Sequence, residues 1–166
     1  MPPAITLRPA GPTDTALILA FIGELAEYEK LAHEVVADHD TLAAQLFGAA
    51  PAAEVVIAEV DGQAAGFALF FHNFSTFLGR RGLYLEDLYV QPQYRGLGLG
   101  RRLMIHLARL AVQRGCGRFE WSVLDWNAPA IAFYRDLGAT PLDEWTVQRV
   151  TGEALRRLAA HDQSGA

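Results

Sequence analysis

Cysteine is almost absent from this 166-residue chain, since Cys116 is the only one. A single cysteine cannot close an intrachain disulfide, so nothing in the sequence points to an oxidising compartment. No apolar run reaches the ~20 residues that a membrane span needs. The first residues also lack the basic and apolar regions of a signal peptide. The sequence therefore predicts a cytoplasmic protein that does not bind a membrane.

Metal-ligand spacing and excess positive charge are missing too. The five histidines are scattered along the chain, so we expect neither a structural nor a catalytic metal. Acids outnumber bases by 19 to 14, and the net charge of −5 argues against a general nucleic-acid-binding protein. Cys116, between two glycines, is expected to be a small buried residue rather than a reactive thiol.

The charges are distributed unevenly. Six acids and one base, Lys30, lie between Glu24 and Asp40, whereas six arginines and no acid lie between Leu88 and Phe119. One interpretation is two solvated helix faces. The other is an enzyme that joins an anionic cofactor to a cationic substrate.

The apolar pattern predicts one domain over residues 1–160 and a flexible tail over 161–166. The expected strands are 5–9, 54–60, 63–72, 83–90, 118–124 and 145–150. The expected helices are one capped by Thr13 or Asp14 and reaching Tyr28, and others at 40–47, 98–114, 127–137 and 151–159. A strand meander followed by alternating strands and helices favours an α/β fold, with a mixed antiparallel and parallel sheet flanked by helices.

Segment 83–90 carries two adjacent acids, Glu86 and Asp87, in an otherwise apolar strand. Burying an unpaired carboxylate is costly, so each acid needs a partner or a function. Because side chains alternate along a strand, we expect Glu86 and Asp87 to point to opposite faces. One of them would then be structural while the other faces a site.

Three glycines at alternate positions, Gly96, Gly98 and Gly100, follow this strand and open the next helix. Glycine lets a backbone approach a ligand closely, and the N–H groups and dipole of a helix N-terminus attract anionic oxygens. Arg95 and Arg101 add positive charge. Taken alone, the pattern describes an ordinary glycine turn equally well, and it fits neither a Walker A loop nor a dinucleotide fingerprint.

The run Arg95-x-x-Gly98-x-Gly100 resembles the pyrophosphate-binding motif of the GNAT acetyltransferase superfamily. Four further stretches, in family order, resemble its diamine acetyltransferase and thialysine N-acetyltransferase branch: 24–30 (ELAEYEK), 83–90 (LYLEDLYV), 123–127 (VLDWN) and 133–139 (FYRDLGA). Together the five stretches are spread over nearly the whole chain, from residue 24 to residue 139. The resemblance implies a GNAT-type sheet in which strands 83–90 and 118–124 splay apart to form a cleft for acetyl-CoA, and it implies a homodimer.

The resemblance also implies roles for single residues. One strand end is expected to pair with the pantetheine arm, the glycine loop to hold the pyrophosphate, and the helix after residue 126 to lie near the arm. These cofactor-binding residues are Leu88, Tyr89, Val90, Arg95, Gly96, Leu97, Gly98, Leu99, Gly100, Arg101, Asn127 and Ala130. Tyr28, Glu29 and Glu86 match amine-binding positions. Glu86 is also the expected base, and Tyr134 the acid that protonates the departing thiolate.

The expected reaction transfers acetyl from acetyl-CoA to the primary amine of a small cationic molecule: a thialysine- or lysine-like amino acid, a diamine or a polyamine. Ser75 stands where diamine enzymes tend to carry an acid, which favours the thialysine type, and the role of Glu144 is open. The alternatives are acetylation of a protein lysine or N-terminus, and a non-catalytic acyl-CoA-binding regulator. Five phenylalanines between residues 67 and 77 indicate either a buried strand or a homodimer interface.

Overall fold

A computed structural model describes residues 1–163, so the predicted tail lies partly outside the described residues, at 164–166. The chain divides into two compact units, Met1–Leu124 and a second that begins at Asp125. The first unit holds the sheet and three helices, α1 to α3. The second holds helices α4 and α5.

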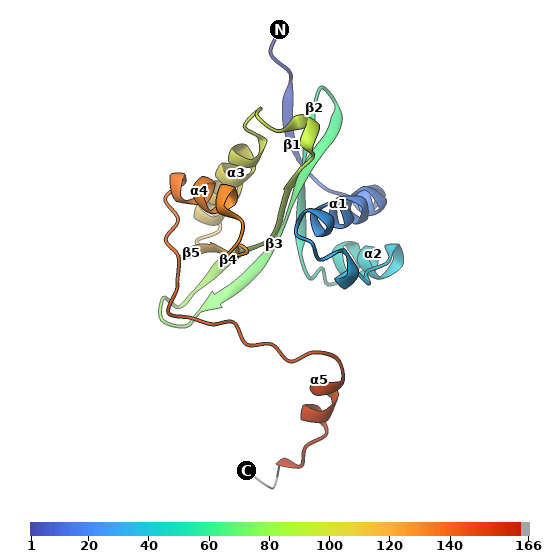
Figure 1. Ribbon diagram of the computed structural model, residues 1–166, viewed down its shortest axis with the longest axis vertical. Helices are drawn as coiled ribbons and strands as arrows, with labels where there is room; N and C mark the ends of the chain where they lie inside the picture. Colours follow the sequence, from blue (N-terminus) through green and yellow to red (C-terminus); the bar gives the residue numbers. More distant parts are fainter. Residues whose placement is uncertain (164–166) are drawn as a thin grey trace. The chain divides into compact units, whose positions relative to one another are not determined.

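Five strands form one sheet in the order β1-β2-β3-β4-β5 (Figure 1). Their bounds are β1 Ile5–Pro9, β2 Glu54–Val60, β3 Gln63–Ser75, β4 Arg80–Val90 and β5 Arg118–Trp121. Strands β1 to β4 pair antiparallel and β5 joins β4 in parallel, so the predicted mixed sheet is confirmed. The β2–β3 turn places Asp61 (φ 48°) and Gly62 (φ 79°) in the left-handed region, as a tight primed turn requires.

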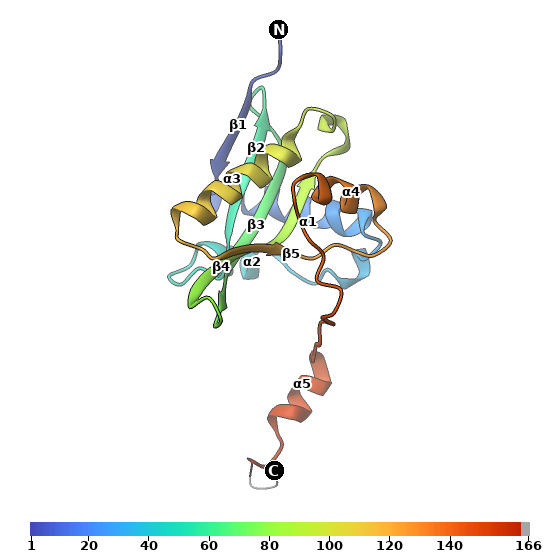
Figure 2. The same cartoon turned by 90° about the vertical axis from the view of Figure 1, so that its left-hand side faces the viewer.

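Helices cover both faces of this sheet (Figure 2). Helices α1 (Thr15–Tyr28) and α2 (His39–Phe47) lie on one face, and α3 (Leu99–Gln113) lies on the other. On the first face, Phe21 of α1 stacks on Phe67 of β3 at a centroid distance of 5.5 Å, within a buried cluster. The buried residues of α3 recur every three or four positions, which gives the helix one apolar stripe; they are Leu99, Leu103, Met104, Leu107 and Ala111.

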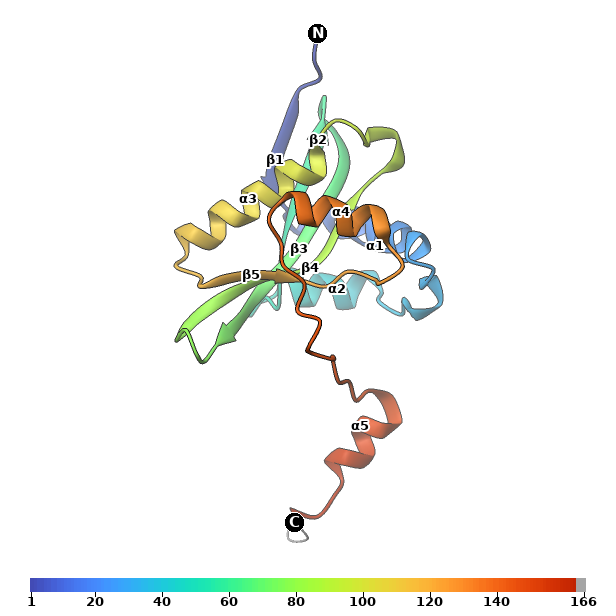
Figure 3. The same cartoon turned by 60° about the vertical axis from the view of Figure 1, so that its left-hand side comes forward.

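The second unit differs from the prediction in one element. Helices α4 (Ala128–Asp136) and α5 (Gly152–Ala159) are present, but the strand predicted over 145–150 is wrong. Among the described residues this segment has no ladder partner, and Figure 3 shows it running without regular structure toward α5. Trp145 and Val147 are 76% and 80% exposed. A β-compatible pattern forms a strand only where a neighbouring strand supplies hydrogen bonds.

The start of α1 is held by an ion pair that the sequence did not predict. Asp14, expected to cap the helix, accepts instead from both terminal nitrogens of Arg8 (2.8 and 2.9 Å) and from the Gly11 N–H (2.8 Å). The Arg8 Nε also donates to Glu59 of β2 at 2.6 Å. The hydrogen bonds from Arg8 hold the pKa of the buried Asp14 carboxyl below its usual value.

We expect Asp14→Asn to lower the free energy of unfolding at pH 7 by about 2 kcal/mol, the order of a hydrogen bond to a charged group. A carboxyl with a depressed folded pKa contributes stability above its unfolded pKa of 3.8 and loses it as the pH falls through the folded value. The difference from wild type should therefore shrink below about pH 4. Urea unfolding at pH 7 and pH 3 measures it. The exposed Asp40 gives the control, Asp40→Asn, and an equal Asp14→Asn loss at both pH values would contradict the ion-pair explanation.

Candidate functional site

The loop between β4 and α3 has a backbone that only glycine adopts easily. Gly96 and Gly98 have φ values of 86° and 78°, in the left-handed region that strains other residues. A Cβ added at either position would meet no protein atom within 4 Å. The glycines are therefore needed for conformation rather than for internal packing, and the space beside them is open to a ligand.

This loop leads directly into the N-terminus of α3. Gly98 is the N-cap residue and offers no side-chain cap, and the first helical hydrogen bond runs from the Arg102 N–H to the Gly98 carbonyl at 3.0 Å. The N–H groups of residues 99–101 thus have no carbonyl partner one turn earlier. Arg101 and Arg102 are exposed beside them. Such an arrangement attracts phosphate oxygens.

Strand β4 is bordered by β5 along only part of its length. The two strands pair at four positions, 82–85 with 118–121, and β5 then ends. Among the described strands, none borders this edge of β4 from Glu86 to Val90. The two strands are not paired along their whole length, as predicted, but the gap arises because β5 ends at Trp121 and not at the predicted residue 124. A strand edge without a neighbouring strand can pair with an extended ligand.

A β-bulge lies where this unpaired edge begins. Leu85 is opposite Phe70 and Asp87 is opposite Leu69, which leaves Glu86 as the extra residue. Because Leu69 and Phe70 point to opposite faces, Leu85 and Asp87 do as well, whereas regular alternation would put them on one face. The simple alternation expected at Glu86 and Asp87 is thus interrupted. Glu86 is exposed and Asp87 is partly buried.

Three carboxylates come together at this bulge. Burial, with a smaller contribution from the negative charges of Glu86 and Glu29, raises the pKa of Asp87 to about 6. Burial also raises the pKa of Glu29, at the end of α1. The cluster can attract a cation and can exchange a proton near neutral pH. Sequence reasoning had placed Glu29 and Glu86 here but missed Asp87, whose only signal was its position beside Glu86.

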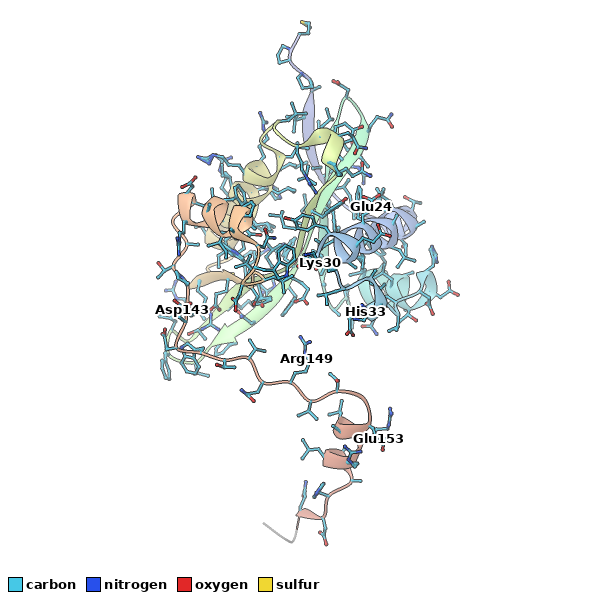
Figure 4. The ribbon with its side chains drawn as sticks, viewed as in Figure 1. Glu24, Lys30, His33, Asp143, Arg149 and Glu153 are labelled. Atoms are coloured by element: carbon cyan, nitrogen blue, oxygen red, sulfur yellow. The ribbon has the colours of Figure 1, made fainter. Side chains whose placement is uncertain are left out.

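The end of α1 is a Schellman turn with an unusual residue. Leu31 N–H donates to the Ala26 carbonyl (2.8 Å) and Lys30 N–H to the Glu27 carbonyl (3.1 Å). Lys30 adopts φ 63°, where glycine is usual. Figure 4 marks Glu24 and Lys30 on this part of the chain. Tyr28, expected to bind amine, places its ring 5.4 Å from the guanidinium carbon of Arg95 in the glycine loop.

The remaining predicted site residues lie in the second unit. Asn127 is buried, and its side-chain oxygen accepts from the Ala130 N–H at 3.3 Å, which caps α4. Tyr134 is partly buried on the same helix, with its ring 5.3 Å from that of Phe133. The roles of Asn127, Ala130 and Tyr134 toward a cofactor stay predictions.

Within residues 1–163 no three or more histidine, cysteine, aspartate and glutamate side chains are grouped so that they could hold a metal ion. None of the helices described there has the length and apolar character to span a bilayer.

A helix terminus that attracts anions, next to a strand edge without a neighbouring strand, can hold an extended ligand that carries phosphates. Residues 22–139 match the acetyltransferase (GNAT) family. The chain belongs to this family and is an acyltransferase, which confirms the resemblance found in the sequence.

Relatives and solved structures agree with this membership. The chain is 41% identical over 164 residues to thialysine N-epsilon-acetyltransferase from Mus musculus, covering 92% of this chain and 96% of that protein. It is 33% identical over 197 residues to an L-ornithine N5-acetyltransferase from Arabidopsis thaliana, covering 92% and 86%. An integron cassette protein from the mobile metagenome of V. cholerae superimposes with a TM-score of 0.80 at 27% identity, covering 95% and 98%. The GNAT-type α/β fold is thereby confirmed.

Proposed function

We propose that this protein transfers the acetyl group of acetyl-CoA to the primary amine of a small cationic molecule, with thialysine- or lysine-like amino acids as the first candidates. The observation that carries this proposal is the carboxylate cluster of Glu29, Glu86 and Asp87, which lies where the pairing of β4 with β5 ends. The names of the relatives from mouse and Arabidopsis support an amino acid side-chain amine as acceptor.

The glycine loop and the β4 edge fit the donor. Open space beside Gly96 and Gly98 and the N–H groups of residues 99–101 suit a pyrophosphate. The edge of β4 at Leu88 to Val90, which none of the described strands borders, suits the amide groups of pantetheine. Acetyl-CoA supplies an acetyl thioester when bound. The protein holds the anionic end of acetyl-CoA, aligns its pantetheine arm and excludes competing water.

The acidic residues act on the acceptor. Glu29 and Glu86 add negative charge that concentrates a cationic amine at the site. An alkylamine with a pKa of about 10.4 must lose a proton before it attacks, at a cost of roughly 4.6 kcal/mol at pH 7. A carboxylate with a pKa of about 6, such as Asp87, accepts that proton more readily than an ordinary one. Glu86 stays the base that the resemblance implies, and Asp87 joins it as a candidate from the structure.

The type of amine depends on the remaining charge around the site. Ser75, where diamine enzymes tend to carry an acid, is buried, and its hydroxyl accepts from the Leu78 N–H at 3.2 Å. Its oxygen is thus used in the β3–β4 turn. One acid fewer suits a substrate with one distant cation, such as an amino acid, better than a polyamine.

Release of coenzyme A thiol on mixing with acetyl-CoA tests the function directly. The panel is thialysine, lysine, ornithine, putrescine, spermidine and a lysine-containing peptide. We expect the highest kcat/KM with thialysine or ornithine. A preference for the peptide would support protein acetylation, and binding of acetyl-CoA without thiol release from any amine would support a regulator.

The thiolate also needs a proton as it departs, and Tyr134 is the proposed donor. We expect Tyr134→Phe to leave the KM of both substrates nearly unchanged and to lower kcat. Because a thiolate of pKa about 8.5 is already an adequate leaving group, the loss should lie near the lower end of the ~10²–10⁴-fold typical of general acids. Steady-state kinetics with Tyr94→Phe as control measures it. A loss below about threefold would exclude Tyr134 as the acid.

A homodimer belongs to the same proposal. Of the five phenylalanines, Phe67 and Phe70 are buried in the core, whereas Phe74 and Phe77 are 58% and 101% exposed at the β3–β4 turn. Exposed aromatic side chains of this kind are common at subunit contacts. Light scattering of the purified chain measures its mass in solution.

A further inference from the structure

Two contacts join the end of α1 to the segment that leads from β4 into the glycine loop. The Arg95 guanidinium carbon lies 5.4 Å from the centre of the Tyr28 ring, and its Nε donates to the Val90 carbonyl at 3.1 Å. The Gln91 side chain donates to both oxygens of Glu24 at 3.3 Å. Residues far apart in the sequence thus connect the proposed amine site with the proposed pyrophosphate site inside the first unit.

The geometry of Arg95 allows it to serve both sites at once. A guanidinium is planar and carries five N–H donors in its plane. Its carbon lies over the face of the Tyr28 ring, and the bond to Val90 uses one donor, at Nε. Its other four N–H groups can still donate to an anion. Arg95 is exposed, so before an anion binds its terminal nitrogens are in contact with water.

We propose that the Tyr28–Arg95 contact couples the two substrate sites, so that coenzyme A in the glycine loop stabilises the end of α1 that carries Glu29. The proposal rests on the proposed function and adds a role for Tyr28 as a positioning residue. An anion that fixes the guanidinium strengthens its contact with the ring, and the ring then holds the last turn of the helix. By linkage, an amine bound beside Glu29 tightens coenzyme A binding by the same factor.

The last turn of α1 has features that allow coenzyme A binding to change its stability. It ends at Lys30 in the left-handed conformation, which is unfavourable for a residue with a side chain. Two N–H groups report on it, Lys30 bonded to Glu27 and Leu31 bonded to Ala26. Helix ends open locally more often than helix centres, and their amides then exchange with solvent.

Hydrogen–deuterium exchange with and without coenzyme A tests the coupling without turnover. The informative peptides cover residues 22–31 and 95–102. The variants are Tyr28→Phe, which keeps the ring, and Tyr28→Leu, which removes it. Phe77→Leu, at an exposed aromatic of the β3–β4 turn, is the control.

In the wild type, in Tyr28→Phe and in Phe77→Leu, we expect coenzyme A to slow exchange in both peptides. The effect on 22–31 should be about two- to fivefold, the size of one exposed cation–π contact. In Tyr28→Leu, protection of 95–102 should persist while that of 22–31 is lost.

The outcomes separate the coupling from the proposed function. Protection of 95–102 without any effect on 22–31 in the wild type would overturn the coupling alone. So would retained protection of 22–31 in Tyr28→Leu, or its loss in Tyr28→Phe. No protection of 95–102 in the wild type would overturn the placement of the donor in the glycine loop, and the coupling with it.

Discussion

Replacing Gly98 by asparagine is expected to weaken coenzyme A binding by about 100-fold. Asparagine is the residue with a side chain that best tolerates the left-handed φ of 78° found there, so the loop should keep its path. Its side chain would fill space that no protein atom occupies within 4 Å of the added Cβ. The pyrophosphate would then lose about two charge-assisted hydrogen bonds, each contributing roughly 1.5 kcal/mol. A β-branched residue such as valine would add backbone strain and confuse the result.

Gly79→Asn is the matched control. Gly79 has φ 64° in the β3–β4 turn, and a Cβ there would also meet no atom within 4 Å. Both variants should lose a similar stability, about 1 kcal/mol for a left-handed residue with a side chain. Calorimetric titration with coenzyme A should show a raised dissociation constant, and so weaker binding, only for Gly98→Asn. Equal affinities in the two variants would mean that the phosphates bind elsewhere.

The sequence predicted the glycine loop well because its signals are local. A run of glycines before an amphipathic helix specifies backbone freedom and an unpaired helix N-terminus within a few residues. The β2–β3 hairpin was equally predictable, since Asp61 and Gly62 determine the turn themselves. The mixed sheet followed from the order of strands and helices.

The carboxylate cluster could not be predicted in the same way. Whether Asp87 lies beside Glu29 depends on the register between β3 and β4, and a single bulge at Glu86 changes that register. The contact of Tyr28 with Arg95 joins residues 67 positions apart. The sequence pattern of a single segment predicts neither the carboxylate cluster nor this contact. The strand expected at 145–150 failed for a related reason, because a strand needs an edge to pair with.

The carboxylate of Asp87, at the bulge, is expected to destabilise the fold when it is ionised, although the proposed reaction uses it. A group whose folded pKa is raised, to about 6 for Asp87 against 3.8, favours the folded state below pH 4. That stability is lost as the pH rises through about 6. The loss is at most about 3 kcal/mol, from roughly two pKa units at 1.36 kcal/mol each. Asparagine cannot ionise and avoids it.

We therefore expect Asp87→Asn to raise the free energy of unfolding at pH 8 by about 1–3 kcal/mol and to leave it unchanged near pH 4. The same variant should lower kcat by ~10²–10⁴-fold and remove the rise of kcat/KM near pH 6, if Asp87 accepts the amine proton. Glu86→Gln is the matched comparison, because Glu86 is exposed and its loss should leave stability nearly unchanged. Two measurements compare wild type, Asp87→Asn and Glu86→Gln: the free energy of unfolding at pH 4 and pH 8, and kcat/KM for thialysine as a function of pH.

A lower stability of Asp87→Asn at pH 8 with normal turnover would make Asp87 a structural hydrogen-bond acceptor. A loss of kcat confined to Glu86→Gln would make Glu86 the base. Asp87 would then contribute only negative charge near it.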